Sequence, residues 1–231
     1  MRVTSSTTGA PRPRKPPTKS VRKLGRPPKV KARDTRRRIL DIARGVYAER
    51  GYEAATNKDI AELAKITTAA LYYHFPSKRD LYLEVHEDAR VQVYGRFEES
   101  IDPDASFAEQ LLAVLNATHE LNAEDPTLAR FLAAARTDMK RRADLSDALD
   151  ARIGFRRQFF DRMVDVGVRT GEIEPAKRDL VTVFIIAMMT GMTDALSDDQ
   201  EVHARAIEAV RSIIAGDIVR PPRTPQRARA S

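Results

Sequence analysis

The sequence contains no cysteine and no tryptophan, and it has ten glycines among 231 residues. Without cysteine the chain has no disulfide, thiolate zinc site, iron–sulfur ligand or cysteine nucleophile. So little glycine disfavours the turns of a β-sandwich, a barrel or a nucleotide-binding loop. The longest purely apolar run, Val183–Met189, has seven residues, whereas a membrane-spanning helix needs about 20. Because the basic N-terminus also lacks the apolar segment of a secretory signal, we expect a soluble, intracellular, helical protein.

No arrangement of residues typical of an enzyme is present. The sequence has no Gly-x-Ser-x-Gly, no Walker loop, no Gly-x-Gly-x-x-Gly and no His-Glu-x-x-His motif. Its four histidines are scattered along the chain. The run His86-Glu87-Asp88 contains metal-ligand residue types, but neighbouring helical positions face different ways, which favours a solvated surface. We expect neither catalysis nor a cofactor or metal.

Positive charge is concentrated at the N-terminus. Residues 1–38 hold fourteen lysines and arginines and one acid, Asp34, whereas the other 193 residues carry 26 bases and 32 acids. A cationic segment on a mildly acidic body favours a polyanionic partner such as nucleic acid. A solvated tail that aids solubility would have the same composition. Six prolines among polar residues predict a disordered arm over residues 1–33.

Within this arm, the segment Leu24-Gly25-Arg26-Pro27-Pro28-Lys29 resembles an AT-hook. Its Gly-Arg-Pro centre would lie extended in the narrow minor groove of A·T-rich DNA. Proline favours an extended backbone, and the negative potential of a narrow groove attracts Arg26. We therefore predict that Arg26 contacts DNA and that A·T-rich sequence flanks the binding site.

From Thr35 onwards the spacing of apolar residues is helical. One face of the first helix carries apolar residues at i, i+3, i+4, i+7 and i+8, namely Ile39, Ile42, Ala43, Val46 and Tyr47. Gly51 is suited to end this helix, and Thr56 opens a short second one. A third helix is expected from about Thr67 to Phe75, where Pro76 stops it. Two short helices after a longer one are typical of a helix-turn-helix.

The residues of this region resemble one family. The chain contains Ile60-Ala61-x-x-Ala64 and then Leu71-Tyr72-Tyr73-His74-Phe75-Pro76-Ser77-Lys78-x-x-Leu81, a pattern similar to the signature of the TetR family of bacterial transcriptional repressors. The resemblance covers about residues 35–85. It implies an all-α fold of about nine helices, with an N-terminal three-helix helix-turn-helix domain and a C-terminal helical bundle. The family's usual Ala-Gly-Val turn is Ala64-Lys65-Ile66 here, which leaves the geometry of that turn open.

The third helix is expected to enter the major groove of DNA. Its exposed positions offer hydroxyl and methyl groups but no arginine, asparagine or glutamine. We therefore expect few specific hydrogen bonds to bases. Leu71 and Phe75 are assigned to the core. The resemblance implies phosphate contacts at the start of the second helix and at the helix N-terminus that carries Lys78. The predicted DNA-binding residues are Arg26, Thr56, Asn57, Lys65, Thr67, Thr68, Ala70, Tyr72, Tyr73, His74 and Lys78.

Beyond residue 85 the chain continues as amphipathic helices without a strand pattern. Predicted helices include one that starts at Ser106 and one from about Ser146 to Gly171. In the TetR family the last two helices pair with their copies in a dimeric four-helix bundle. The predicted interface residues are Ile185, Met188, Met192, Val202, Ala206, Val210 and Ile213. The same apolar faces would also suit the core of a single chain.

The resemblance also implies an effector pocket among the middle helices. Binding there would favour a conformation that no longer fits DNA. The candidate lining residues indicate an apolar or aromatic ligand, with Arg136 or His119 as a polar contact. They are Tyr94, His119, Phe131, Arg136, Phe155, Phe159, Met163 and Met188. Each of these residues also fits an ordinary core position.

The sequence thus predicts a homodimeric repressor that binds a palindromic double-stranded DNA operator and is released by a small-molecule effector. A transcriptional activator, an effector-independent regulator of the same family and an architectural A·T-rich DNA-binding protein are the alternatives. We expect a disordered basic arm over 1–33, a helix-turn-helix domain over 34–82, a ligand-binding and dimerisation domain over 83–218, and a disordered basic tail over 219–231. The expected location is the bacterial cytoplasm, with nucleoid association when DNA is bound.

Overall fold

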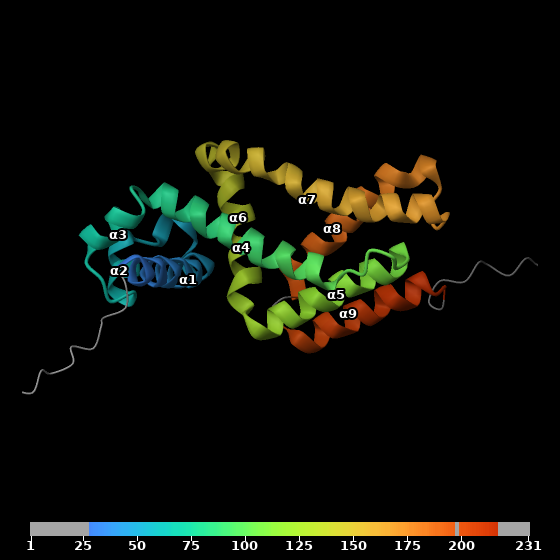
Figure 1. Cartoon of the computed structure of the whole chain (residues 1–231), viewed down its shortest axis with the longest axis horizontal. Helices are drawn as coiled ribbons and strands as arrows, with labels where there is room; N and C mark the ends of the chain where they lie inside the picture. The colour runs from blue at the N-terminus through green and yellow to red at the C-terminus, as the bar shows by residue number, and fades with distance from the viewer. Residues whose placement is uncertain (1–27, 197–198, 217–231) are drawn as a thin grey trace, which may run out of the picture.

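The computed structural model describes residues 28–196 and 199–216, and within these ranges every regular element is a helix (Figure 1). The first three are α1 Pro28–Ala54, α2 Asn57–Leu63 and α3 Thr68–His74. The next four are α4 Lys78–Ser100, α5 Phe107–Glu124, α6 Pro126–Arg141 and α7 Ala143–Thr170. A short 3-10 helix, η1 Pro175–Lys177, precedes α8 Arg178–Leu196 and α9 Gln200–Ile214. The predicted all-α fold is confirmed.

Two helix boundaries differ from those that the sequence predicts. Helix α1 begins at Pro28, so residues 28–33 are helical and do not belong to a disordered arm. Proline fits the first turn of a helix because its missing N–H would have no partner there. Helix α7 begins at Ala143, three residues before the predicted start at about Ser146, and Gly171 follows its last residue. Arg26 and the predicted basic tail lie outside the described residues.

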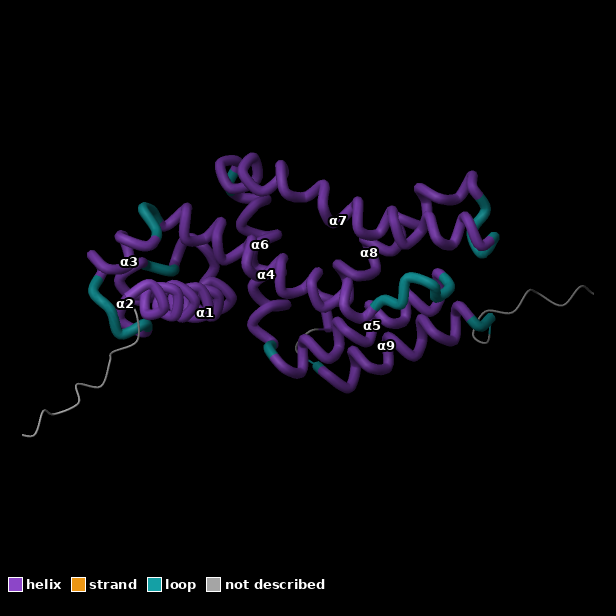
Figure 2. The backbone as a smooth tube through the Cα atoms, in the orientation of Figure 1, coloured by secondary structure: helices purple, strands orange, loops and turns teal. Residues whose placement is uncertain are grey.

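The helices form two packed groups that share α4. Helices α1–α3 lie at one end of the molecule, and α4 runs from there into the group formed by α5, α7, α8 and α9 (Figure 2). One core lies between α1–α4 and α6, and the other lies among α4, α5, α7, α8 and α9. Helix α6 crosses between the two groups and contacts both. None of the helices in the described ranges is long and apolar enough to cross a membrane.

The turn between α2 and α3 is fixed by its own hydrogen bonds. The N–H of Ile66 donates to the carbonyl of Ala61, and the N–H of Lys65 donates to the carbonyl of Glu62, each at 3.0 Å. This pair of bonds defines a Schellman motif, which places Lys65 at the position where glycine is usual. Lys65 has a φ of 53° and is the one non-glycine residue with positive φ in the described part of the chain. The turn therefore keeps its usual geometry although the glycine is missing.

A buried carboxylate on α6 holds the end of α1. The chain bends at Gly51, whose φ is 68° and ψ is 176°. Just beyond, the N–H of Tyr52 donates to Oδ2 of Asp138, and the Tyr82 hydroxyl of α4 donates to the same oxygen, both at 2.9 Å. Asp138 is 9% exposed, and burial followed by the Asp138 charge raises the pKa of Tyr82 well above its usual value. One carboxylate thus joins α1, α4 and α6.

The opposite end of α6 is held by an arginine of α1. Arg44 is buried, and its Nη2 donates to Oδ2 of Asp125 at 2.5 Å. Its Nε donates to the hydroxyl of Thr127 at 2.9 Å. Asp125 is also the N-cap of α6, where its side chain accepts the Thr127 N–H. The start of α6 is therefore attached to the middle of α1, and its last turn to the end of α1.

Lys65→Gly is expected to raise the free energy of unfolding by about 1 kcal/mol, because glycine adopts positive φ without the steric cost that a Cβ brings. Lys65→Ala removes the same amine but keeps the Cβ, so it should leave stability close to that of the native chain. Urea denaturation followed by circular dichroism measures both variants. Equal stability of Lys65→Gly and Lys65→Ala would contradict a strained turn.

Asp138→Ala is expected to lower the free energy of unfolding by about 2–3 kcal/mol, because two buried donors lose their acceptor. Tyr82→Phe removes one donor and leaves the Tyr52 bond intact, so its cost should be about 1 kcal/mol. The exposed Asp147 of α7 provides the control, since Asp147→Ala should change stability by less than about 0.5 kcal/mol. If chemical denaturation shows that Asp138→Ala lowers the free energy of unfolding no more than this control does, Asp138 is not a stabilising acceptor for Tyr52 and Tyr82.

Candidate DNA-binding surface and internal cavity

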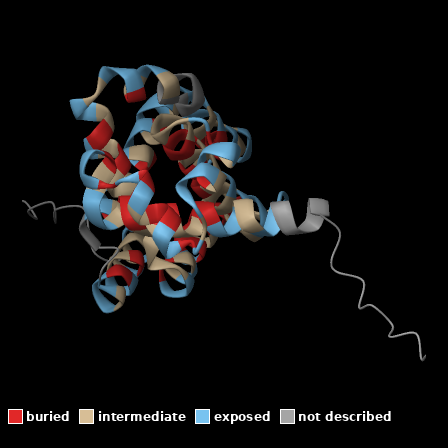
Figure 3. Ribbon diagram, turned by 90° about the vertical axis from the view of Figure 1, so that its left-hand side faces the viewer, coloured by how far each residue is buried: buried red, intermediate tan, exposed pale blue. Residues whose placement is uncertain are grey.

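Helix α3 presents one polar and aromatic face to solvent. Leu71 and Phe75 are buried, as predicted, and anchor the helix on the core. Tyr73 is 85% exposed and Tyr72 is 47% exposed. Thr67 caps the helix, since its hydroxyl oxygen accepts the Ala70 N–H. Figure 3, which views the molecule from the α1–α3 end, shows buried residues between the helices and exposed residues on the outer surface.

The exposed surface around α3 contains most of the predicted DNA contacts. Thr56 lies at the N-terminus of α2, where its hydroxyl oxygen accepts the Asp59 N–H at 3.1 Å. Lys65 in the turn and Thr68 at the first position of α3 are exposed, and Ala70 and His74 are half-buried. The ring of His74 meets the edge of the Tyr73 ring, with centroids 5.4 Å apart.

Two of the predicted DNA contacts face the protein. Asn57 is 7% exposed, and neither polar atom of its side chain has a hydrogen-bond partner. It belongs to the buried face of α2 because it lies three and four residues before Ile60 and Ala61, the other buried residues of this helix. The amine of Lys78 donates to the carbonyl of Glu53 at 3.2 Å and lies 4.5 Å from the centre of the Tyr52 ring. Burial lowers the pKa of Lys78.

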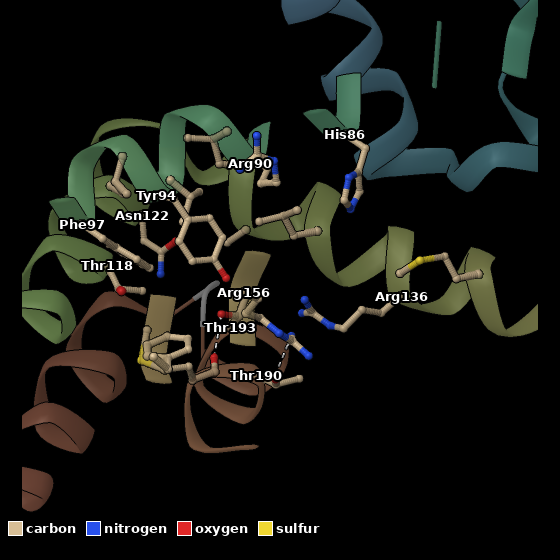
Figure 4. Close-up of a pocket in the computed structure, with 18 of the residues that line it drawn as sticks. His86, Arg90, Tyr94, Phe97, Thr118, Asn122, Arg136, Arg156, Thr190 and Thr193 are labelled. Atoms are coloured by element: carbon tan, nitrogen blue, oxygen red, sulfur yellow. Dashed lines mark hydrogen bonds between the residues drawn. The ribbon is translucent and has the colours of Figure 1, made fainter. Parts of the chain in front are cut away.

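A cavity of about 410 Å³ lies between α4, α5, α6, α7 and α8. Of the eight predicted lining residues, Tyr94 and Arg136 line it. Burial raises the pKa of Tyr94 to about 12 against the opposing effect of nearby arginines. Figure 4 shows Tyr94 pointing from α4 into this space and Arg136 entering it from α6. The cavity is a candidate small-molecule site, since such sites are concave, largely apolar and carry few polar groups.

The other predicted lining residues do not line the cavity. Phe131 is fully buried among Tyr47, Tyr82 and His86, of which His86 lines the cavity. Phe155 packs edge-on against Tyr94. The remaining ones belong to the core of the α5, α7, α8 and α9 group, namely Phe159, Met163 and Met188.

His119 is also absent from the cavity and packs against α9 instead. Its ring stacks on that of His203, with an interplanar angle of 10° and 3.3 Å between the two Nδ1 atoms. His203 is fully buried. Burial, and then the neighbouring His119, lowers the pKa of His203. His119, which was predicted as a polar contact for the ligand, is thus part of the contact between α5 and α9.

Sequence reasoning missed most of the residues that line the cavity. Several are polar or cationic residues in register with apolar ones on the same helix face. Arg90, Tyr94 and Phe97 share a face of α4, and Arg156 precedes Phe160 by one turn of α7. A charged residue at core spacing was the available signal. The missed residues that carry polar groups include Arg90, Thr118, Asn122, Lys140, Arg156, Thr190 and Thr193.

The cationic side chains of the cavity differ in their partners. Arg90 donates to both oxygens of Glu87 and lies over the Phe155 ring, while Arg136 pairs with Asp194. Nη1 of Arg156 donates to the Thr190 hydroxyl at 3.4 Å. Figure 4 shows the guanidinium groups of Arg136 and Arg156 pointing toward one another. No group of three metal-ligand side chains occurs in the part of the chain that the structure describes.

Helices α8 and α9 leave several apolar side chains in solvent. Leu180, Val183 and Phe184 of α8 are 68%, 48% and 61% exposed. On α9 the exposed ones are Val202, Ile213 and Ile214. Of the predicted interface residues, Val202 and Ile213 lie on this exposed surface. Ile185 and Met192 were wrongly assigned, because they are buried in the protomer's own core, and Met188, Ala206 and Val210 are half-buried against it.

Solved structures share this arrangement of helices. The transcriptional regulator FadR from Bacillus subtilis, in complex with stearoyl-CoA, aligns with 79% of this chain and 98% of its own, with a TM-score of 0.68 and 22% identity. A transcriptional regulator from Saccharomonospora viridis in complex with choline aligns with 82% of this chain and 100% of its own, with a TM-score of 0.68 and 20% identity. These similarities establish the fold.

Sequence comparison establishes the family. Residues 39–85 match the model of bacterial regulatory proteins of the tetR family. The HTH-type transcriptional repressor KstR2 of Mycolicibacterium smegmatis is 31% identical over 150 residues, which are 64% of this chain and 72% of that protein. The chain therefore belongs to the TetR family of bacterial regulatory proteins and is a DNA-binding transcriptional regulator, not an enzyme.

Proposed function

We propose that the protein is a homodimeric repressor that binds a palindromic operator through α3 and is released when a small molecule occupies the cavity. The observation that carries this proposal is the exposed face of a short, capped α3, supported by a buried core and linked by α6 to an internal cavity. The similar KstR2 protein is a repressor by name, which supports repression over activation.

The chemistry of α3 favours DNA contacts from hydroxyl and methyl groups. Thr68 and Tyr72 would reach base edges or phosphates in the major groove, and Ala70 would offer a methyl contact to thymine. Tyr73 and the hydroxyl of Thr67 would reach the backbone. Lys65 replaces Lys78 as the phosphate-binding lysine of this proposal, because its side chain is exposed while the half-buried amine of Lys78 is engaged by the Glu53 carbonyl and the Tyr52 ring.

Such a surface offers few strong base contacts, so the basic N-terminal residues would supply additional affinity. Each phosphate neutralised by lysine or arginine releases counterions and steepens the salt dependence of binding. Arg26 in a flanking A·T-rich minor groove would add a contact that depends on groove width. We infer that specificity arises from α3 and the N-terminal residues together.

The exposed apolar residues of α8 and α9 support a dimer. Leu180, Val183 and Phe184 follow helical spacing on one face of α8, and Val202 and Ile213 are exposed on α9. A second copy of the same surface would cover these side chains in a two-fold arrangement. The two copies of α3 would then match half-sites about one helical turn of DNA apart.

Ligand binding would release the protein from DNA through α6, which lines the cavity and also contacts α1. Leu132, Arg136 and Met139 face the cavity. A ligand can shift the equilibrium only by its difference in affinity between the two conformations. A ligand that favours another position of α6 would move α1 through Arg44 and Asp138, and the spacing of the two α3 helices would change. The similar folds that hold stearoyl-CoA and choline carry ligands of unlike charge, so the fold alone does not set the ligand class.

Fluorescence anisotropy with DNA from the region upstream of this gene tests the DNA-binding proposal. At roughly physiological salt the full chain should prefer this DNA over a scrambled duplex by about 10³-fold or more. Removing residues 1–27, which leaves α1 complete, should weaken binding and flatten its salt dependence because cationic contacts are lost. Unchanged affinity and salt slope in the shortened chain would exclude a role for the N-terminal residues.

Phe184→Glu tests the dimer. A charge placed in the apolar surface of α8 should yield a monomer in sedimentation velocity, and operator affinity should fall with the loss of the second half-site. Val91 is similarly exposed, at 53%, and belongs to α4, which packs mainly against α1, α5, α6 and α7. Val91→Glu is therefore the control and should stay dimeric. A dimeric Phe184→Glu variant with full operator affinity would place the interface elsewhere.

A further inference from the structure

We propose that the cavity binds an amphipathic carboxylate, with its apolar body among the aromatic and aliphatic residues and its carboxylate on Arg156. This assignment names the ligand class of the site and rests on the proposed function in treating the cavity as the effector site. It gives the apolar or aromatic ligand that the sequence predicts a negative charge, and it makes Arg156 the main polar contact in place of Arg136 or His119.

The first observation is the one-sided charge of the cavity wall. Four lysine and arginine residues line the cavity, namely Arg90, Arg136, Lys140 and Arg156, and among the described residues no aspartate or glutamate lines it. Placing charges of one sign in a largely apolar interior is unfavourable unless each has a counter-charge. An anionic ligand would provide that counter-charge, whereas a cationic ligand would increase the repulsion.

The second observation is that one of the three half-buried arginines has no acidic partner among the described residues. Arg90 is paired with Glu87, Arg136 is paired with Asp194, and Lys140 is exposed to solvent. Arg156 is half-buried, and among the described residues its guanidinium contacts the neutral hydroxyl of Thr190 and no carboxylate. Its planar donors match the two oxygens of a carboxylate. Arg156 is therefore the anchor for a single negative charge.

The third observation is the position of the neighbouring groups. The guanidinium of Arg136 on α6 faces that of Arg156 on α7, and the Tyr94 hydroxyl points toward the same place (Figure 4). Burial and the nearby Arg156 charge lower the pKa of Arg136 to about 10. A carboxylate between the two guanidinium groups would reduce their repulsion and accept further hydrogen bonds from Tyr94 and Thr190.

The fourth observation is the apolar remainder of the cavity. Val93 and Phe97 of α4, Leu121 of α5, Phe160 of α7 and Met189 of α8 line it. The volume of about 410 Å³ lies at the lower end of the range for sites that enclose drug-sized ligands, roughly 300–1,000 Å³. This space suits a compact hydrocarbon body with one charged end.

Calorimetric titration of the full-length protein tests this assignment without DNA. The probes are two pairs of matched shape, decanoate with 1-decanol and adamantane-1-carboxylate with 1-adamantanemethanol, all below their aggregation concentrations. At least one carboxylate should bind about tenfold or more tightly than its neutral partner, because the alcohol cannot pair with the buried cation. Equal affinities within both pairs, or no binding of either carboxylate, would overturn the proposal.

Variants of Arg156 identify the anchor. Arg156→Met should remove the preference for the carboxylate while the alcohol binds as before, and Arg156→Lys should restore part of the preference. Arg157 is the matched control, since it is the next residue on α7 and pairs with Asp179. Arg157→Met should keep the full preference, and an equal loss in Arg156→Met and Arg157→Met would refute Arg156 as the anchor.

Two further titrations distinguish an anionic ligand from a cationic one and a free acid from its thioester. Decyltrimethylammonium should bind more weakly than decanol, and tighter binding would refute an anionic ligand. Decanoyl-CoA distinguishes a free acid from its thioester. If it binds more tightly than decanoate, the anionic head is the nucleotide and the carboxylate assignment is wrong. These titrations contain no DNA, so they test the ligand class separately from the operator. If the protein discriminates between the probes but does not bind its upstream DNA specifically, the ligand class stands and the proposed operator is wrong.

Discussion

The buried carboxylate of Asp138 fixes how the DNA-binding end of the molecule sits on the rest. It accepts hydrogen bonds from the Tyr52 N–H and the Tyr82 hydroxyl, so three helices meet at one oxygen. Gly51 supplies the bend before Tyr52, since its φ of 68° is a conformation that residues with a Cβ rarely adopt. A buried acceptor with two donors is costly to separate from either. Helix α1 is therefore tied to α6 at its end as well as at Arg44.

Helix α6 has two faces, one packed on the core beneath α1–α3 and one that lines the cavity. Phe131, Ala135 and Asp138 lie at i, i+4 and i+7 and face the core beneath α1–α3. Leu132 and Arg136, each one residue further along, face the cavity. Consecutive residues lie about 100° apart around a helix, so the two faces adjoin. A shift or rotation of α6 that improves the fit to a ligand therefore also moves the face that packs beneath α1–α3. Packed interiors change between discrete arrangements and do not deform continuously, which makes α6 suitable as the coupling element of the proposed switch.

Local features of the fold could be predicted from sequence, and tertiary ones could not. Helix starts at Thr56 and Thr67, and the division of α3 into a buried Leu71 and an exposed Tyr73, depend on residues within one or two turns. The direction in which a buried aromatic faces depends on distant helices. Phe131 fits a pocket or a core equally by its spacing, and its actual neighbours, Tyr47 and Tyr82, are far away in sequence.

Arginines on apolar helix faces show where sequence reasoning reaches its limit. Arg44 on α1 and Arg156 on α7 both lie in register with core residues, and such a position is unfavourable for a charge without a partner. Arg44 finds Asp125, more than eighty residues away, and becomes part of the structure. Arg156 meets a hydroxyl beside a cavity. The same local pattern thus marks a structural ion pair in one case and a candidate ligand anchor in the other, and the position of a carboxylate distant in sequence decides which.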